Sequence, residues 1–523
     1  MLVLRSCYIP SVRDILRKSP RFFFWVLIGA IALRILFVLC LPAITSDSFV
    51  YGDIAKNWLQ HGIYGLTGRN EISPTYIRLP GYPAFLAIVF AIFGMEHYRA
   101  ALILQVFVDV TTCILIADIA RRVVSPKAAR TAFLLAAFCP FLANYCAAAL
   151  TETWEIFFTV LALDLALLGL EKEQSAKWLA VGLSVGAAML LRPDGALLLV
   201  AVEAFLFWQC VRQQPKARLR MMKSAVVALI SAVLPLAPWA LRNLRTFHEF
   251  QPLAPRYANQ EGTFVPLGFE RWMRTWIADY ASTEEVYWSV PGSPMDIDQL
   301  PARAFDSQTQ RDRTEQLLDD YNRSLRVTPD LDQGFAALAA ERIHHAPWRY
   351  YLRLPLLRIA DMWLRPRTEI LPCNSRWWEF DEQTKWLAVN IAFGVINLLY
   401  ITAAILGLLR WPHTTFPSLL LTFLILRSVF LGTLENPETR YTLECYPIVI
   451  VLAAALIVRR NMGSSQVLRA TPPSAEVHAS GESVIRNRVR TCSESNSMAA
   501  RFATGSAWAK YFIASTSKRC PST

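Results

Sequence analysis

Long apolar runs recur along the chain and set its architecture. A spanning helix needs roughly 20 apolar residues, and the sequence supplies about ten such runs. They cover residues 22–41, 98–120, 128–147, 150–170, 176–191, 194–211, 223–241, 386–409, 414–432 and 441–458. The pattern predicts an all-α fold, a polytopic membrane helical bundle of about ten spans.

The polar residues between these runs divide the chain into four parts. We expect an N-terminal transmembrane core with an outer loop at 42–97, a large extracytoplasmic loop, a C-terminal transmembrane part, and a tail. Their limits are 1–243, 244–385, 386–460 and 461–523. The tail is rich in Ser, Thr, Ala, Asn and Arg without helical periodicity, which predicts disorder in the cytoplasm.

Basic residues gather at alternate ends of the runs. The clusters are Arg13 to Arg21, Arg121 to Arg130, Arg212 to Lys223, and Arg459 with Arg460. All fall on one side of the predicted bundle, which the positive-inside rule makes cytoplasmic. The net charge of +12 is therefore a topology signal rather than evidence of nucleic-acid binding. We predict a multi-pass protein of the cell (inner) membrane, with both termini cytoplasmic and an uncleaved first span.

The large loop carries helical patterns of its own. Soluble helices are expected over 308–325 and 333–345. Residues 348–365 place charged and apolar side chains on separate faces, which predicts a juxtamembrane helix lying in the membrane interface. The alternative is a short tilted span carrying Arg358 and Asp361.

The stretch after the first run, Ser46 to Asn57, places carboxylates at the mouth of a span. Asp47, on the outer side, is the leading candidate for a general base toward an acceptor hydroxyl or amine. The alternative is that Ser46 or Asp47 caps the helix that follows. Asp53 points to another helix face and is expected to play a supporting part.

Arginines recur at the outer ends of the predicted spans. Guanidinium forks suit a phosphate or pyrophosphate, although each arginine alone also fits an interfacial anchor. The residues are Arg78, Arg192, Arg242 and Arg440. Glu152 follows Thr151 at the start of a span and is either a capping residue or part of the site.

Within the membrane, charged side chains need partners. Arg34 and Asp109 can pair if the first two spans pack together. The histidines show no metal-ligand spacing, so no metal site is predicted. The sequence leaves open whether a divalent cation assists.

Several motifs follow one another in a recognisable order. They are Asp-x3-Tyr-x3-Ala-x-Asn from Asp47, His61-Gly62-Ile63-Tyr64, Arg-x-Pro-Gly-Tyr-Pro from Arg78, Thr151-Glu152, Arg192-Pro193, Pro-Trp-x2-Arg-Asn from Pro238, and Arg440-Tyr441. This set resembles the GT-C membrane glycosyltransferases of the glycosyltransferase family 39 type. That type includes protein O-mannosyltransferases, the lipid A aminoarabinose transferase and lipopolysaccharide galacturonosyltransferases.

The resemblance implies a catalytic carboxylate at Asp47 and a polyprenyl-phosphate sugar as donor. It implies donor phosphate binding by Arg440, with Arg192, Arg242 and Arg78 as further candidates. Supporting or substrate-binding positions are Asp53, Tyr51, Tyr82, Glu152 and Tyr441. Many relatives have Asp-Glu where this chain has Asp47-Ser48, which argues against any site of two carboxylates.

The function expected is transfer of the sugar, with inversion, to a lipid, glycan or protein acceptor on the outer face of the membrane. Trp and Tyr faces in 244–385 suit the acceptor's sugar rings. The alternative is a transporter or flippase for a lipid-linked or anionic substrate. Such proteins usually have half-to-half symmetry with interrupted helices, which this sequence does not show.

Overall fold

The computed structural model describes residues 19–457, except 70, 173, 213, 261, 380–382 and 411–417. The expected disordered tail and the basic residues before 19 and after 457 lie outside the described residues.

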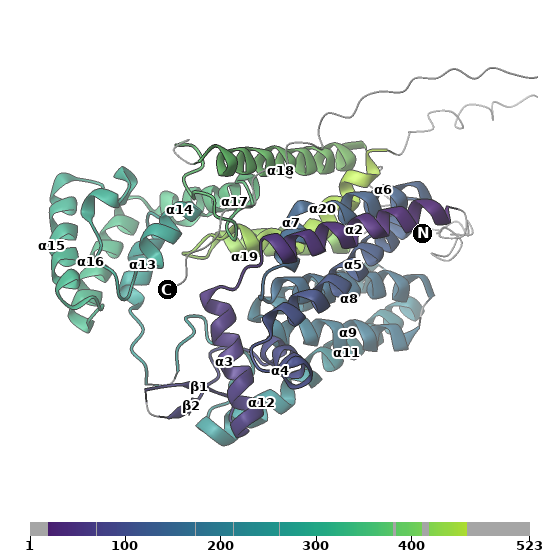
Figure 1. Cartoon of the computed structure of the whole chain (residues 1–523), viewed down its shortest axis with the longest axis horizontal. Helices are drawn as coiled ribbons and strands as arrows, with labels where there is room; N and C mark the ends of the chain where they lie inside the picture. Colours follow the sequence, from purple (N-terminus) through teal and green to yellow (C-terminus); the bar gives the residue numbers. More distant parts are fainter. Residues whose placement is uncertain are drawn as a thin grey trace, which may run out of the picture. The chain divides into compact units, whose positions relative to one another are not determined.

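Helices make up most of the described chain (Figure 1), as the sequence predicted. In the described part of the chain, six segments are long and apolar enough to cross a membrane. They are α2 (Pro20–Cys40), α5 (Tyr98–Val123), α8 (Glu152–Lys172), α10 (Ala196–Arg212), α11 (Pro215–Val233) continued by α12 (Ala237–Phe247), and α18 (Thr384–Arg410). The predicted all-α polytopic membrane bundle is confirmed.

The predicted count of about ten spans is not confirmed. Helices α6 (Pro126–Ala137) and α7 (Pro140–Cys146) meet at 51°, and counting them as one bent span gives seven in the described part of the chain. The remaining apolar helices are shorter. These are α4 (Gly81–Phe93), α9 (Ser175–Leu191), α19 (Ser418–Gly432) and α20 (Tyr446–Ala455). The last run begins with a 3₁₀ helix, η7 (Thr439–Cys445), so only its second half is α-helical.

A buried ion pair joins α2 to α5. Arg34 Nε lies 2.5 Å from Asp109 Oδ2, with side chains 0% and 2% exposed. The Arg34 guanidinium also donates to the carbonyls of Ala136 and Ala137 at the end of α6. The pair expected from the sequence is therefore present, and it ties three helices together.

We expect the ion pair of Arg34 and Asp109 to contribute to the stability of the fold. Asp109→Asn removes the partner of a fully buried guanidinium, and we expect it to lower stability by about 3–5 kcal/mol. The measurement is thermal unfolding of the detergent-solubilised protein. A double variant, Arg34→Met with Asp109→Leu, should recover much of the loss because it leaves no buried charge. Equal losses in the single and double variants would contradict this account.

A separate small core lies in the segment between α12 and α18. Helices α13 (Leu267–Arg274), α15 (Gln308–Ser324) and α16 (Pro329–His345) enclose Trp272, Tyr321 and Phe335, each fully buried. Both soluble helices expected from the sequence are present. The second begins earlier than predicted because Thr328 caps it, accepting from the Leu331 N–H, and Pro329 occupies its first position.

The predicted interfacial helix is also helical, as a π-helical turn η6 (Arg349–Arg353) followed by α17 (Leu354–Leu364). Its charged face is packed against protein. Arg358, 1% exposed, donates to the carbonyls of Arg274, Ile277 and Gly432. Asp361 accepts from the Tyr280 N–H at 2.9 Å. Its location in the membrane interface stays a prediction.

Candidate active site

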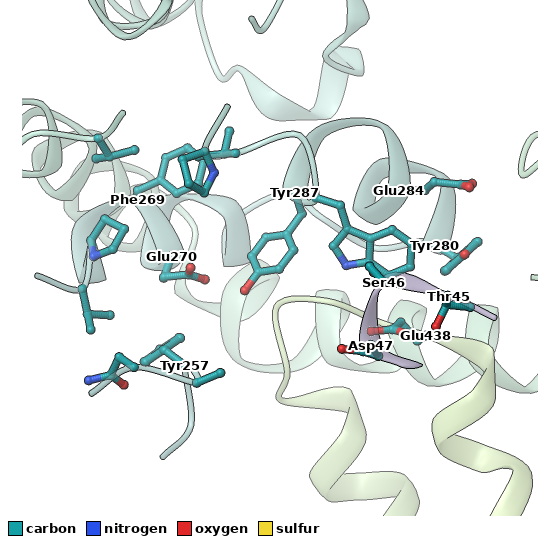
Figure 2. Close-up of a pocket in the computed structure, with 18 of the residues that line it drawn as sticks. Thr45, Ser46, Asp47, Tyr257, Phe269, Glu270, Tyr280, Glu284, Tyr287 and Glu438 are labelled. Carbon is teal, nitrogen blue, oxygen red and sulfur yellow. The ribbon is translucent and has the colours of Figure 1, made fainter. Parts of the chain in front are cut away.

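A cavity of about 890 Å³ opens at the start of α3 (Ser46–His61). Its walls come from the first turn of α3, the segment 257–270, the stretch from α14 (Tyr280–Ser282) to Pro291, and η7. Figure 2 shows Asp47 and Glu438 on one side of this space, with Glu270, Tyr257 and Tyr287 further along it. The candidate base from the sequence therefore lines a cavity large enough for a sugar ligand.

Asp47 is not the cap of its helix. Thr45 occupies the N-cap position, and its N–H donates to Ser48 Oγ at 3.0 Å. The Asp47 carboxylate instead accepts from Arg78 Nη2 at 2.9 Å and lies 3.6 Å from Arg440 Nη2. Thr45 thus provides the capping role considered for Asp47, and the carboxylate of Asp47 is shared between two arginines.

The two arginines control the charge of Asp47. Burial raises the pKa of this carboxyl, but Arg440 and Arg78 together outweigh burial and hold the pKa below its usual value. Asp47 is therefore ionised at neutral pH. Loss of either arginine contact would raise its affinity for a proton.

Arg440 connects Asp47 to a second arginine. Its Nη1 lies 3.7 Å from Glu152 Oε1, and the same oxygen lies 3.5 Å from Arg192 Nη1. Glu438 approaches Arg440 Nε at 2.5 Å, and the Arg192 guanidinium lies 4.7 Å from the centre of the Tyr441 ring. The structure therefore brings the predicted residues Asp47, Arg78, Arg440, Glu152, Arg192 and Tyr441 into one connected group.

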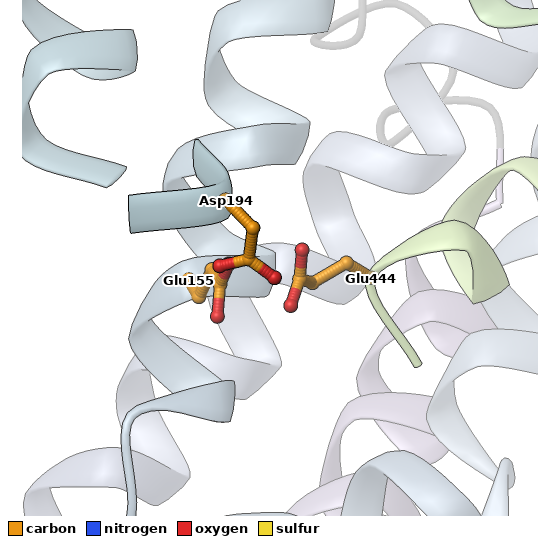
Figure 3. A group of neighbouring side chains, drawn as sticks. All are labelled: Glu155, Asp194 and Glu444. Atoms are coloured by element: carbon orange, nitrogen blue, oxygen red, sulfur yellow. The ribbon is translucent and has the colours of Figure 1, made fainter. Parts of the chain in front are cut away.

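Three acidic residues lie next to one another, as Figure 3 shows. They are Glu155, Asp194 and Glu444, and one carboxylate oxygen of each lies within 4.8 Å of the others. Arg192 Nε is 3.3 Å from Glu155 and 3.2 Å from Asp194. Such a set could hold a cation, but guanidinium groups already contact all three carboxylates.

Arg427 on α19 supplies the second guanidinium. It is 0% exposed, and its Nη2 lies 2.9 Å from Asp194 Oδ2, 2.5 Å from Glu444 and 3.8 Å from Glu155. Because Asp194 contacts both Arg427 and Arg192, this buried layer fixes the position of Arg192.

The sequence analysis did not predict this buried group of charged residues, although three features of the sequence indicate it. Glu155 follows Glu152 by one helical turn, so the two carboxylates share a face. Arg427 is a lone charge in the apolar run 414–432, which marks a buried partner or function. Glu444 and Glu438 lie on either side of Arg440 in the sequence.

Other predicted residues lie outside the connected group. Arg242 donates to the carbonyls of Tyr64 and Thr75 at 2.7 and 2.8 Å, so it holds the hairpin of β1 (Gly65–Thr67) and β2 (Ile72–Pro74). Asp53 accepts from the N–H and the hydroxyl of Thr67 at 2.7 and 2.8 Å. Both contacts are structural, and the structure does not join Arg242 to the other arginines at Asp47.

Two tyrosines, Tyr51 on α3 and Tyr82 on α4, pack together beside this region. Tyr51 and Tyr82 pack edge to face at 5.2 Å, and the Arg78 guanidinium lies 5.9 Å from the centre of the Tyr51 ring. The Tyr82 hydroxyl donates to Gln105 Oε1 at 2.8 Å, deep in the bundle. Tyr51 therefore contacts the site through Arg78, whereas Tyr82 packs beneath it.

The cavity also presents carboxylates that sequence reasoning did not single out. Glu369 accepts from the Tyr145 hydroxyl at 2.7 Å, and its second oxygen is buried with no hydrogen-bond partner. Glu270 likewise has one buried oxygen without a partner. Burial and the neighbouring Glu435 raise the pKa of Glu270 to about 7. No motif in the sequence marks either residue.

Residues 74–239 match the protein family described as dolichyl-phosphate-mannose-protein mannosyltransferase. The match covers the Arg78 element, Glu152 and Arg192, and confirms the predicted resemblance to GT-C membrane glycosyltransferases. A search of the curated proteins finds no match.

Two solved structures match this chain over most of its length. The archaeal oligosaccharyltransferase AglB from Archaeoglobus fulgidus, in complex with an inhibitory peptide and a dolichol-phosphate, is 15% identical with a TM-score of 0.45; the match covers 84% of this chain and 50% of that one. ArnT from Cupriavidus metallidurans, bound to undecaprenyl phosphate, is 14% identical with a TM-score of 0.36; the match covers 84% and 77%. The matched part thus spans about half the length of the oligosaccharyltransferase.

Proposed function

We propose that this protein transfers a sugar from a polyprenyl-phosphate donor to a lipid, glycan or protein acceptor on the outer face of the cell membrane. One observation carries the proposal. A carboxylate shared by Arg78 and Arg440 lies at the wall of a large cavity, and a second pair of residues, Glu152 and Arg192, continues the charge network. The match of residues 74–239 to a mannosyltransferase family supports the same reaction class.

Arg440 and Arg192 are suited to the donor phosphate. Both contact Glu152 only at 3.5–3.7 Å, which is longer than a good charge-assisted hydrogen bond. The Nε atoms of Arg440 and Arg192 are already paired with other carboxylates, so a phosphate can compete for their Nη atoms. Arg440 is 17% exposed and lines the cavity, so its guanidinium can reach a ligand there.

Donor binding would also activate Asp47. When a phosphate takes over Arg440, Asp47 loses one of the two cations that lower its pKa and becomes a stronger base. Asp47 then accepts the proton of the acceptor's hydroxyl or amine. The acceptor atom bonds to the anomeric carbon, the bond from that carbon to the phosphate oxygen breaks, and polyprenyl phosphate leaves. Direct displacement of this kind inverts the anomeric centre.

A comparison of cells tests this proposal. Surface glycolipids and glycoproteins would be compared by mass spectrometry in cells with the gene, without it, and with an Asp47→Asn copy. The proposal expects one glycan to lose a single sugar in both altered strains. Identical glycans in all three strains would contradict it.

The proposed orientation in the membrane can be tested by labelling introduced cysteines. Glu315 on α15 and Lys127 at the start of α6 are both exposed, and the charge pattern assigns them to opposite sides. We expect a membrane-impermeant maleimide to label Glu315→Cys in intact cells, and Lys127→Cys only after permeabilisation. The reverse pattern would place the cavity on the cytoplasmic side and remove the outer-face assignment.

A further inference from the structure

The cavity beside Asp47 has an excess of negative charge. Its lining includes five carboxylates, Asp47, Glu270, Glu284, Glu369 and Glu438, against two arginines, Arg326 and Arg440. Asp47 and Glu438 pair with Arg440. Glu270, Glu284 and Glu369 form no ion pair with an arginine or lysine in the described part of the chain.

The arginines near Glu270 do not neutralise its charge, because they pair with another carboxylate. Arg256 and Arg274 both bind Glu435, with Nη2 to Oε2 distances of 2.7 and 2.8 Å. One oxygen of Glu270 and one of Glu369 are buried and have no hydrogen-bond partner among the described residues. Leaving such atoms without a partner is costly, so they mark positions where a ligand donor would be favourable.

Aromatic side chains line the same space. Tyr257, Phe264, Phe269, Tyr280, Tyr287 and Trp288 all contribute to the walls, and Figure 2 shows Tyr287 directed toward Glu270. Aromatic faces bind both the apolar face of a sugar ring and a cation. Carboxylates combined with aromatic faces are therefore suited to a ring that carries positive charge.

We propose that this cavity binds an acceptor glycan carrying a protonated amine, with Glu270 and Glu369 as its main anionic contacts and Glu284 at the rim. The proposal deepens the proposed function, on which it rests, by naming the class of acceptor. The ammonium group anchors the acceptor, and a hydroxyl of the same glycan is the nucleophile presented to Asp47. An acceptor that carries a phosphate or a uronic acid at this position would be repelled by Glu270, Glu284 and Glu369.

The raised pKa of Glu270, about 7, fits this assignment. Burial and the adjacent Glu435 cause the rise. A bound ammonium would supply positive charge next to Glu270 and lower its pKa again. The pKa of Glu369 is also raised, chiefly by burial, although Arg367 and Arg440 act against the rise.

Binding can be measured without the donor, which separates this proposal from the transfer reaction. The purified full chain in detergent would be titrated with four short-chain alkyl glycosides: a glucosaminide, its N-acetyl form, a glucoside and a glucuronide. We expect the glucosaminide to bind at least about tenfold more tightly than its N-acetyl form, as a charge-assisted contact allows. The glucuronide should bind most weakly.

Variants locate the site. The preference for the glucosaminide should fall in Glu270→Gln and in Glu369→Gln, and persist in Glu315→Gln, which removes an exposed carboxylate on α15. Equal binding of the amine and N-acetyl forms, or a preference that survives both cavity variants, would overturn the proposal. Tighter binding of a lysine tripeptide than of the glucosaminide would assign the cavity to peptide instead. If the preference holds but no sugar is transferred from a polyprenyl-phosphate donor, the proposed function fails while the amine site stands.

Discussion

Asp47→Asn is expected to reduce sugar transfer by about 10²–10⁴-fold, the usual contribution of a general base. The amide keeps the size of the side chain and an acceptor for Arg78, so the start of α3 should stay folded, with Thr45 still at the N-cap. What is lost is the ability to take a proton from the acceptor. The measurement is the initial rate of transfer at saturating donor.

Asp53→Asn is the matched control for this variant. It lies on the same helix and keeps an oxygen that accepts from Thr67. Its transfer rate should stay close to that of the unaltered protein. An Asp47→Asn protein of normal abundance that transfers sugar at the normal rate would rule out Asp47 as the base.

Arg440→Gln should give the second large effect, a loss of about 10²–10³-fold in kcat, because a cation opposite the departing phosphate acts mainly in the transition state. It should also weaken donor binding. Arg440 is the first of the cations that lower the pKa of Asp47, so its removal raises that pKa. The acidic limb of the kcat/KM profile should therefore move to higher pH.

Arg242→Gln provides the contrast for Arg440→Gln. Arg242 holds carbonyls of the hairpin region and does not join the group around Asp47. We expect Arg242→Gln to lower thermal stability and leave the pH profile in place. A pH profile that is the same in Arg440→Gln and the unaltered protein would contradict the coupling between Arg440 and Asp47.

The fold class followed from the sequence because long apolar runs have one stable solution in a membrane. The boundaries did not follow. The run 441–458 reads as a continuous span, yet its first residues form a 3₁₀ helix that carries Tyr441 and Glu444 into the site. The run 128–147 is interrupted at Pro140, where α7 begins at an angle to α6.

The candidate site followed from the sequence only in part. Of the four arginines expected at span ends, the structure brings Arg78, Arg192 and Arg440 into one group with Asp47 and Glu152. The same rule included Arg242, which stacks on Trp239 and Phe247. The position of an arginine at the end of a span predicts its depth in the membrane, but it does not predict which neighbouring helix its side chain faces. Glu270 and Glu369 are far from Asp47 in the sequence, and only the folded structure places all three in the lining of one cavity.

The most direct test of the central claim uses the purified protein in liposomes with a polyprenyl-phosphate sugar labelled in its sugar. The account predicts that the label leaves the carrier lipid and appears in an added amine-bearing glycan acceptor, in the unaltered protein and not in Asp47→Asn. Label that stays on the carrier lipid and only moves between the two leaflets would contradict it, and would identify a flippase instead.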